Sequence, residues 1–423
     1  MPEMVGNDVD IWVKDEDRVK FYEIVEELAA TLNYTLNYTS RLTLKGEGDY
    51  FLIKENDSIS VIHLDCWAHI HWKGITYVDE STFEEYLIWN KKGICIPSPG
   101  IESSILLLKD LIYNTKVKER YKNAIKEYSK RDSEVFLKSI SKSFGNKTAN
   151  FILEMAKRGD WRALEQRTNK FRLILLLRAF LHPLSQAKKW FNYIRAQIRR
   201  FFISSHGLFI VLIGPDGSGK STTAKTLLES VVVKKLFQKR YYFHGHFPYL
   251  PELKKIASFF KVNRKKVILS SCETTDNLSE PFSLFRALIY PIYYGLNYFL
   301  GHFLIWRERA RAGLVIFDRY FYDYFLQKQF LKCPRWLLLF IAKVIPKPDA
   351  IIYLKNRPKT IYNRKSELSV DEIERQAKVC DEIVSRLPNA FVIETFSGPE
   401  EVAEKIQRII VDKIRAKQKR FGV

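Results

Sequence analysis

Short apolar runs in the second half of the chain alternate with longer stretches that have helical spacing. Five such runs occur, at residues 208–213, 240–243, 314–317, 350–354 and 391–393. Strands that are buried on both faces have continuous apolar sequences, and parallel strands need long crossover connections. The pattern therefore predicts an α/β domain over residues 205–415, built on a doubly wound, parallel, five-stranded sheet.

The first 115 residues have a different pattern, in which short β-rich runs surround one helical segment. The predicted strands are residues 9–13, 42–44, 50–53 and 60–64, and the predicted helix is residues 19–32. This mixture indicates an α+β domain over residues 1–115. Residues 116–204 have helical spacing and are basic throughout, which predicts a helical connector, and residues 416–423 are predicted to form a basic, solvated tail.

Charge and cysteine content indicate which partners and which compartment suit the chain. Its formal net charge is +21 over 423 residues, which favours anionic partners such as nucleotides, phosphorylated glycans or an acidic membrane surface. No nucleic-acid recognition motif is evident, so we expect no specific nucleic-acid binding. The five cysteines form no CxxC pair and the first residues resemble no secretory signal, so we expect a cytoplasmic protein.

Two apolar stretches raise the question of a membrane. Residues 287–306 are uncharged but include Pro291, Gly295 and Asn297 and lead into a predicted strand. We therefore expect core helices of the α/β domain there rather than a membrane span. Residues 190–202 repeat apolar side chains at helical spacing among lysines and arginines. This second stretch has two interpretations, a helix that lies peripherally on an anionic membrane or a linker helix packed against both domains.

A glycine-rich segment, residues 214–221 (GPDGSGKS), joins the first apolar run of the α/β domain to a helical stretch. This is the context of a P-loop, in which backbone N–H groups and a helix N-terminus surround a polyphosphate. Lys220 then reaches the β- and γ-phosphates and Ser221 holds Mg²⁺. The predicted ATP-binding residues are Gly214, Asp216, Gly217, Ser218, Gly219, Lys220, Ser221 and Thr222.

The apolar run at 314–317 ends in Asp318, which Arg319 and Tyr320 follow. In P-loop proteins an aspartate at the end of the strand beside the loop helps to hold Mg²⁺ through its water shell. This triplet, the acid at the third P-loop position (Asp216) and the later segment 364–368 (RKSEL) together resemble the thymidylate kinase-like branch of the nucleoside monophosphate kinases. The resemblance covers about residues 207–413.

That resemblance implies an ATP- and Mg²⁺-dependent phosphotransferase. It implies that Lys220 bridges the phosphates, that Asp318 and Arg319 meet Mg²⁺ and the acceptor phosphate, and that Asp216 faces the acceptor sugar. Arg364 falls where the family has its lid, and a lid guanidinium neutralises charge on the transferred phosphoryl group; Arg375 is a second lid candidate. The expected catalytic residues are Lys220, Asp318, Arg319 and Arg364, and the expected Mg²⁺ ligands are Ser221 and Asp318.

One segment departs from the family. Thymidylate kinases have an Arg-Glu-Pro segment after the second strand that grips the acceptor, whereas residues 243–248 here are FHGHFP. The acceptor implied by the resemblance is a nucleoside monophosphate. The departure leaves two alternatives, a sugar, phosphosugar or glycan hydroxyl as acceptor, or an ATP-sensing module with negligible turnover.

The N-terminal region contains three candidate metal-binding carboxylates. Asp8 and Asp10 are two residues apart in a predicted strand, so their side chains share one face, and Asp65 follows another predicted strand. Three converging carboxylates are typical of two-metal sites for nucleotidyl transfer. The pattern resembles the Gly…Asp-x-Asp…Asp motif of the nucleotidyltransferase superfamily over residues 5–115, without the Gly-Ser turn of that family. Such a domain is either an active transferase or a structural or substrate-recognition relic.

Overall fold

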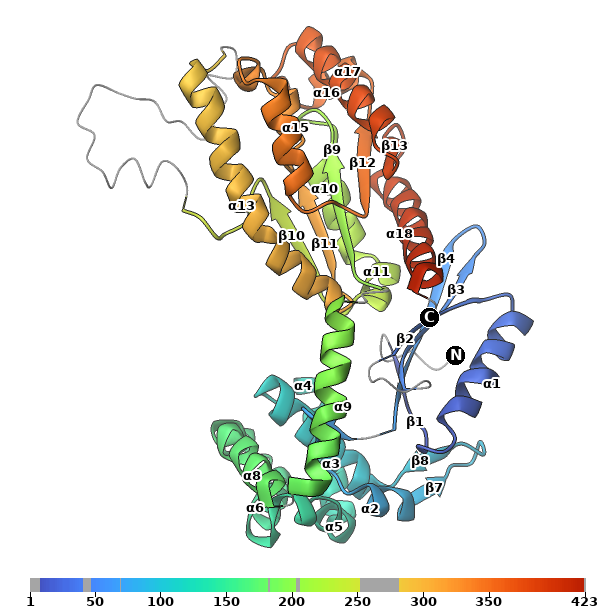
Figure 1. Ribbon diagram of the computed structural model, residues 1–423. Helices are drawn as coiled ribbons and strands as arrows, with labels where there is room; N and C mark the ends of the chain where they lie inside the picture. Colours follow the sequence, from blue (N-terminus) through green and yellow to red (C-terminus); the bar gives the residue numbers. More distant parts are fainter. Residues whose placement is uncertain are drawn as a thin grey trace, which may run out of the picture.

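Figure 1 shows the computed structural model of the chain. The structure describes residues 8–40, 47–68, 70–181, 183–202, 206–251 and 281–421. An α/β domain, an N-terminal sheet and a group of helices make up these ranges. The predicted strand at residues 42–44 lies outside them.

The α/β domain has the predicted five-stranded sheet. Its strands lie in the order β10-β11-β9-β12-β13 and every neighbouring pair is parallel. The strands are β9 (Leu208–Ile213), β10 (Arg240–His244), β11 (Leu314–Asp318), β12 (Ala350–Lys355) and β13 (Ala390–Glu394), each within two residues of its predicted bounds. The P-loop follows β9, the central strand, so the prediction of a doubly wound sheet is confirmed in its number of strands and their direction.

Helices cover both faces of this sheet. One face of β9, with Leu208, Ile210 and Leu212, joins a core formed with α10, α11 and α18; the other, with Phe209 and Val211, joins a core formed with α13 and α15. Apolar side chains on both faces explain why β9 is a continuous apolar run. The helices of the domain are α10 (Lys220–Glu229), α11 (Val231–Leu236), α13 (Leu284–Ala310), α14 (Asp323–Leu326), a 3₁₀ turn (Lys328–Phe330), α15 (Arg335–Val344), α16 (Pro358–Arg364), α17 (Val370–Arg386) and α18 (Pro399–Phe421).

The N-terminal sheet has four strands in the order β1-β4-β3-β2. They are β1 (Val9–Trp12), β2 (Thr35–Ser40), β3 (Gly48–Glu55) and β4 (Ile59–Trp67), with α1 (Arg18–Thr31) after β1. Strand β1 is parallel to β4, and the other two pairs are antiparallel. The sequence prediction missed β2, because TLNYTS contains few of the apolar residues that mark a buried strand.

The N-terminal sheet and the α/β domain share one hydrophobic core. Phe51 and Ile53 of β3 and Ile59 and Val61 of β4 are buried together with residues of β9, α11 and α18. Phe51 stacks on two imidazoles, His63 at 4.5 Å and His206 at 4.3 Å between ring centroids. Burial lowers the pKa of His206 to about 4, so this ring is neutral at physiological pH. The two regions are therefore packed against each other through buried side chains.

The C-terminal helix α18 extends this contact and corrects one prediction. The helix continues to Phe421, and Lys417 and Gln418 near its end contact the rest of the fold instead of being solvated. Lys417 Nζ donates to the Gly207 carbonyl at 2.7 Å and pairs with Asp349 at 2.9 Å, and Gln418 Nε2 donates to the Tyr38 carbonyl at 3.1 Å. The prediction failed because the positive charge of this segment does not reveal which partners the fold brings to it.

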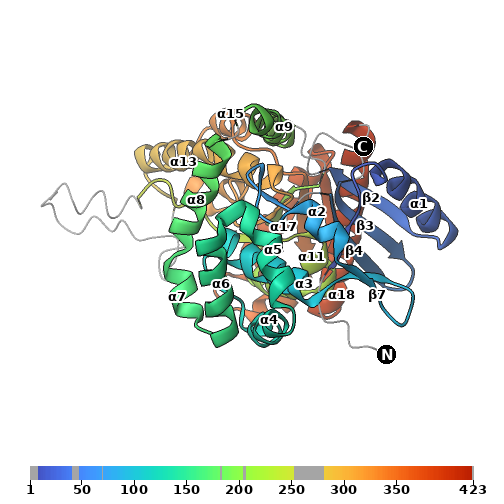
Figure 2. The ribbon, with the colours of Figure 1, turned by 90° about the horizontal axis from the view of Figure 1, so that it is seen from below.

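The remaining helices form a third layer, seen from below in Figure 2. They are α3 (Pro99–Lys109), a π-helical turn (Asp110–Asn114), α4 (Glu119–Arg131), α5 (Ser133–Phe144), α6 (Asn146–Arg158), α7 (Trp161–Gln166), α8 (Thr168–Leu181) and α9 (Pro183–Phe202). Their core also includes Ile70, Trp72 and Phe83, from the short elements β5 (His71–Trp72), β6 (Ile75–Thr76), α2 (Glu80–Glu85), β7 (Leu87–Trp89) and β8 (Cys95–Pro97). Side-chain packing thus places residues 70–114 with the helices rather than with the N-terminal sheet.

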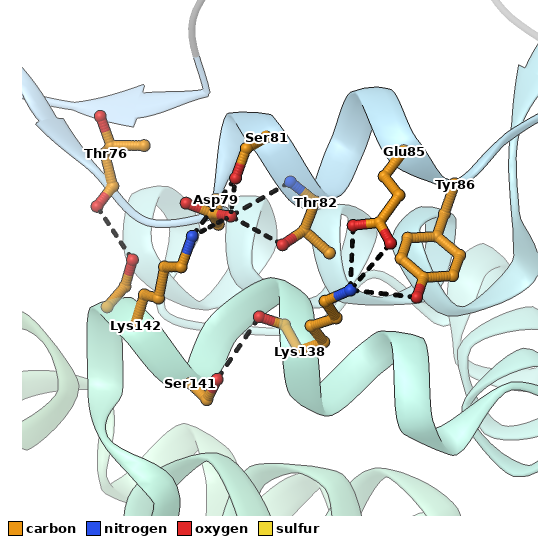
Figure 3. A network of polar contacts seen from close by, with 10 residues as sticks. Thr76, Asp79, Ser81, Thr82, Glu85, Tyr86, Lys138, Ser141 and Lys142 are labelled. Atoms are coloured by element: carbon orange, nitrogen blue, oxygen red, sulfur yellow. Dashed lines mark hydrogen bonds and ion pairs between the residues drawn. The ribbon is translucent and has the colours of Figure 1, made fainter.

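Figure 3 shows how α2 is fixed to α5. Asp79 caps α2 by accepting from the Thr82 amide at 3.1 Å and also pairs with Lys142 of α5 at 2.9 Å. Burial alone raises the pKa of this carboxyl, but hydrogen bonds from Ser81, Lys142 and Thr82 outweigh it and lower the pKa to about 2. One turn later, Lys138 of α5 pairs with Glu85 at 2.9 Å. These contacts hold the connection between the sheet and the helical layer in place.

Candidate functional site

The P-loop has a backbone that only glycine adopts without strain. Gly214, Gly217 and Gly219 have φ of 148°, 88° and 96°, values in the region that side chains rarely adopt. At Gly214 an added Cβ would also lie 2.8 Å from Ser218 Oγ. The loop leads directly into α10, whose first residue is Lys220. The predicted strand, glycine-rich loop and helix therefore form the geometry of a phosphate-binding loop.

Lys220 folds back over the loop. Its Nζ donates to the Gly214 carbonyl at 2.7 Å and to the Pro215 carbonyl at 3.0 Å, and it lies 3.6 Å from Asp216 Oδ1. The side chain is only 5% exposed. The loop carbonyls are acceptors for this buried ammonium. A phosphate in the loop offers a charged acceptor to the same amine.

Asp318 is the centre of a cluster of hydrogen bonds at the end of β11. Its Oδ2 accepts from Ser221 Oγ at 2.6 Å and from the Tyr242 hydroxyl at 3.0 Å, and His244 Nδ1 lies 3.4 Å away. The residue is completely buried, and its Oδ1 has no hydrogen-bond partner. A buried carboxylate oxygen without a partner, beside a serine hydroxyl, fits the oxygen ligands that Mg²⁺ prefers. Ser221 and Asp318, the two predicted ligands, thus lie together.

Asp216 and Arg319 form a second pair in the same place. Arg319 NH2 donates to Asp216 Oδ1 at 2.9 Å. Burial acts to raise the pKa of Asp216, but the positive charges of Lys220, Arg319 and Lys365 outweigh it and hold that pKa below its usual value. Arg319 has φ of 61°, a left-handed conformation that costs free energy in a residue other than glycine and that clusters at functional sites.

A cleft of about 500 Å³ opens beside these residues. This volume is within the usual range for small-molecule sites. All predicted ATP-site residues line it except Gly214, and so do the predicted catalytic residues Asp318, Arg319 and Arg364. Its side chains include four cations (Lys220, Arg319, Arg364 and Lys365) and two carboxylates (Asp216 and Asp318). That balance of charge favours a polyanion.

The two lid candidates have different surroundings. Arg364, the last residue of α16, lines the cleft. Arg375 instead donates to Glu372 from Nε at 2.9 Å, and its NH2 also bonds the Leu326 carbonyl. Glu372 is 5% exposed, and Lys328 also pairs with it, at 3.2 Å. Arg375 therefore has a structural role within α17, and Arg364 is the lid candidate that the geometry favours.

Several residues of the cleft were not predicted. Thr395, Ser397 and Val402 line it from the segment after β13, and Tyr242 bonds Asp318 from β10. No motif marks these positions, because their place depends on which strands become neighbours. Asp323 was also not predicted, although it is not among the residues that line the cleft: burial raises its pKa to about 7, and the positive charge of Lys220 opposes this shift. Its distance of five residues from Asp318 was the only signal in the sequence.

The segment that departs from thymidylate kinases lies at the edge of the cleft. His244 lines the cleft, whereas the His246 ring lies 5.2 Å from that of Tyr294 on α13. The loop is pinned to α13, because Asn297 accepts from the Phe247 amide at 2.9 Å and donates to the Phe247 carbonyl at 3.0 Å. Of the two histidines predicted as acceptor-pocket candidates, only His244 is among the lining residues of this cleft.

The three N-terminal carboxylates lie close together. One carboxylate oxygen from each of Asp8, Asp10 and Asp65 falls within 4.8 Å of the others, and Asp10 pairs directly with Asp65 in the register of β1 and β4. This meets the geometric expectation from strand alternation. Asp65 is buried and the other two are exposed. Lys109 Nζ lies 3.4 Å from Asp10 Oδ1, so an ammonium competes with any cation at this edge of the sheet.

No protein-family model and no curated protein matches the chain. Among solved structures, the chain is similar to the thymidylate kinase from Candida albicans, with 19% identity and a TM-score of 0.36 over 49% of this chain and 93% of that one. It is also similar to the thymidylate kinase from Ehrlichia chaffeensis, with 15% identity and a TM-score of 0.31 over 50% of this chain and 98% of that one. Both matches leave about half of this chain outside the similar part.

Proposed function

We propose that the α/β domain is an ATP- and Mg²⁺-dependent phosphotransferase. The observation that carries the proposal is the convergence of the glycine loop, Lys220, the Ser221–Asp318 pair and Arg364 on one cleft. An ATP-binding sensor needs a loop to hold the phosphates, but it has no need for a further guanidinium such as that of Arg364 in the cleft. Phosphoryl transfer does need one, because charge spreads over the transferred group in the transition state.

In this proposal each group of the cleft has one task. Lys220 leaves the loop carbonyls and bonds the β- and γ-phosphates, while Arg364 neutralises charge on the moving phosphoryl group. Ser221 and Asp318 would hold Mg²⁺, which would supply charge stabilisation to the phosphates. Thr395, Ser397 and Val402 offer hydroxyl and apolar contacts to the nucleoside part of ATP. Positioning and electrostatics, rather than covalent chemistry, lower the barrier.

The acceptor is proposed to meet Asp216 and Arg319. A carboxylate accepts from a sugar hydroxyl, and a guanidinium offers a planar fork to a phosphate. A nucleoside monophosphate has both groups and is the acceptor that the family resemblance implies. His244 replaces the arginine-containing segment that clamps thymidine monophosphate in the resembled enzymes, so we propose that the acceptor range includes phosphosugars or glycan hydroxyls.

An acceptor panel with labelled ATP tests this proposal. We expect the wild-type protein to transfer label to at least one nucleoside monophosphate, phosphosugar or glycan fragment, with kcat/KM for thymidine monophosphate below about 10⁴ M⁻¹s⁻¹. Asp318→Asn should lower transfer to the best acceptor by about a hundredfold, because it removes a charged oxygen ligand. The outcome that contradicts a phosphotransferase is ATP binding without transfer to any acceptor. A kcat/KM above 10⁴ M⁻¹s⁻¹ that is highest for thymidine monophosphate contradicts the broader acceptor range.

The N-terminal carboxylates support a second hypothesis, a divalent metal site for nucleotidyl transfer. Its basis is the convergence of Asp8, Asp10 and Asp65 within 4.8 Å. Titration with Mn²⁺ in the absence of nucleotide tests it. We expect Asp65→Asn to weaken Mn²⁺ binding about tenfold or more, since it removes one carboxylate from a shared site. The control is Asp57→Asn, in the exposed turn between β3 and β4. Equal Mn²⁺ binding by both variants and the wild type would mean that the cluster is a relic of the fold.

A further inference from the structure

Helix α13 exposes large apolar side chains along its whole length. They recur every three or four positions, as on one face of a helix: Phe285, Ile289, Ile292, Leu296, Phe299, Leu300, Phe303 and Trp306. Phe285 is 72% exposed and Phe303 is 63% exposed. The opposite face, with Ala287, Tyr298 and Ile305, already packs on the sheet. A helix on the surface of a globular protein normally turns polar side chains to water. Helix α13 instead has a second apolar face, which is exposed in the described structure.

Helix α15 continues this exposed face. Trp336 is 69% exposed and Phe340 is 60% exposed, and Leu339 and Val344 are also exposed. The two helices are in contact: His302 Nε2 lies 2.9 Å from the Val344 carbonyl, and Gly295 of α13 allows close approach to Ile341 of α15. Because both helices cover the same face of the sheet, their outer faces form one surface.

Helix α9 adds to the same side of the molecule. Phe191, Ile194 and Ile198 are each more than half exposed, and α9 contacts α13. Figure 2 shows α9, α13 and α15 along one side, at the top of that view. We call the exposed apolar residues of α9, α13 and α15 the apolar surface. Contiguous apolar patches of this kind mark interaction sites rather than ordinary solvent-exposed surface.

The charges around the apolar surface indicate what covers it. Helices α9, α13 and α15 contain ten basic residues and a single acidic one. That acid, Glu308, is completely buried and pairs with Arg307 at 2.6 Å. Exposed lysines and arginines such as Arg195, Arg199 and Lys343 flank the apolar residues. The matching partner is apolar inside and negatively charged at its surface, as an anionic lipid bilayer is. A second copy of this chain, with its own charge of +21, does not match.

We propose that α9, α13 and α15 seat the protein on the surface of an anionic lipid bilayer. The apolar surface enters the boundary between headgroups and acyl chains, and the flanking lysines and arginines contact the lipid phosphates. Among the described helices, none has both the length and the hydrophobicity that a membrane span requires. The helices therefore lie along the bilayer surface, and this attachment does not depend on the phosphotransferase proposal.

Vesicle flotation with the full-length protein tests the attachment. We expect the wild type to bind vesicles of phosphatidylcholine mixed with phosphatidylglycerol and to bind pure phosphatidylcholine about tenfold or more weakly. Phe303→Ser/Trp336→Ser should weaken binding to the mixed vesicles about tenfold or more, through lost apolar burial. Arg195→Glu/Arg199→Glu should weaken it by more than about twentyfold, at about fivefold per basic side chain.

Matched control variants distinguish binding through the apolar surface from nonspecific binding through other exposed aromatic or basic side chains. Trp89, on β7, is 74% exposed, and Lys91 and Lys92 follow it in an exposed turn. We expect Trp89→Ser and Lys91→Glu/Lys92→Glu to bind the mixed vesicles as the wild type does. The proposal is overturned if the wild type stays with neither kind of vesicle, or if the two surface variants bind like the controls. It is also overturned if the wild type sediments as a dimer that Phe303→Ser/Trp336→Ser converts to a monomer, because a second copy then covers the apolar surface.

Discussion

Lys220→Ala is expected to lower phosphoryl transfer at least a hundredfold, or about 3 kcal/mol of transition-state stabilisation. The side chain of Lys220 is 5% exposed, and its amine donates to two carbonyls of the loop. A phosphate bound in the loop would offer this amine a charged acceptor in place of those carbonyls. The measurement is kcat/KM for ATP with the best acceptor from the panel. Transfer is expected to fall more than ATP binding, because charge on the phosphoryl group grows in the transition state.

The matched control for this substitution is Lys225→Ala. Lys225 lies on the same helix, α10, but is exposed and does not line the cleft. It removes the same charge and should leave turnover within about twofold of wild type, as expected for an exposed ion without a partner in the cleft. Wild-type turnover in Lys220→Ala would remove the phosphate-bridging role from this residue and leave the apolar surface proposal untouched.

Phe51→Ala is expected to destabilise the whole described structure by about 3–5 kcal/mol, the usual cost of deleting a buried phenylalanine. Phe51 is 3% exposed and lies between two imidazoles in the core that the N-terminal sheet shares with the α/β domain. Its loss leaves a cavity at the contact between the two regions. Thermal unfolding, followed by circular dichroism with and without ATP, should show one transition. Its Tm should be lower than that of the wild type, and ATP should raise the Tm of that single transition.

Trp89→Ala is the control for this prediction. It removes a larger aromatic side chain, but one that is 74% exposed, so the free energy of unfolding should change by less than about 0.5 kcal/mol. Two separate transitions in Phe51→Ala, with the ATP-protected one at the wild-type Tm, would contradict a shared folding unit. That result would mean that the α/β domain is stable without the N-terminal sheet.

The phosphate site was predictable because its chemistry depends on neighbours in the sequence. The loop, its glycines, Lys220 and Ser221 occupy one short segment, and a buried strand before it and a helix after it restrict the geometry. Asp318 was found for a related reason, since it ends an apolar run and parallel strands end at the same edge of a sheet. The five strands of the sheet were located within two residues for the same reason: apolar side chains on both faces leave an uninterrupted pattern.

Contacts between distant segments were not predictable in this way. Thr395 reaches the cleft, and Tyr242 reaches Asp318, only because β13 and β10 fold beside the strands that they do. The segment around Lys417 is rich in lysine and arginine, which is typical of a solvated tail. In the structure Lys417 instead pairs with Asp349 and donates to the Gly207 carbonyl. Helix α13 was predicted to be a core helix, and one of its faces does pack in the core with the sheet and α15. Its second apolar face is exposed. The sequence could not show this, because it does not indicate which side chains of the helix face the sheet.

The shared hydrophobic core also restricts how this chain can diversify. A P-loop domain acquired from another protein by recombination would arrive with side chains on its counterparts of α11 and α18 that do not fit β3 and β4. Lys235 of α11 donates to the Val61 carbonyl at 2.9 Å, and Arg408 of α18 donates to the Asp57 carbonyl at 2.9 Å. Both bonds are made across the junction, so a graft would lose packing and polar contacts together. We therefore expect the two halves to be exchangeable only together, and changes at Ile53 or Val61 to need compensating changes on the facing helices.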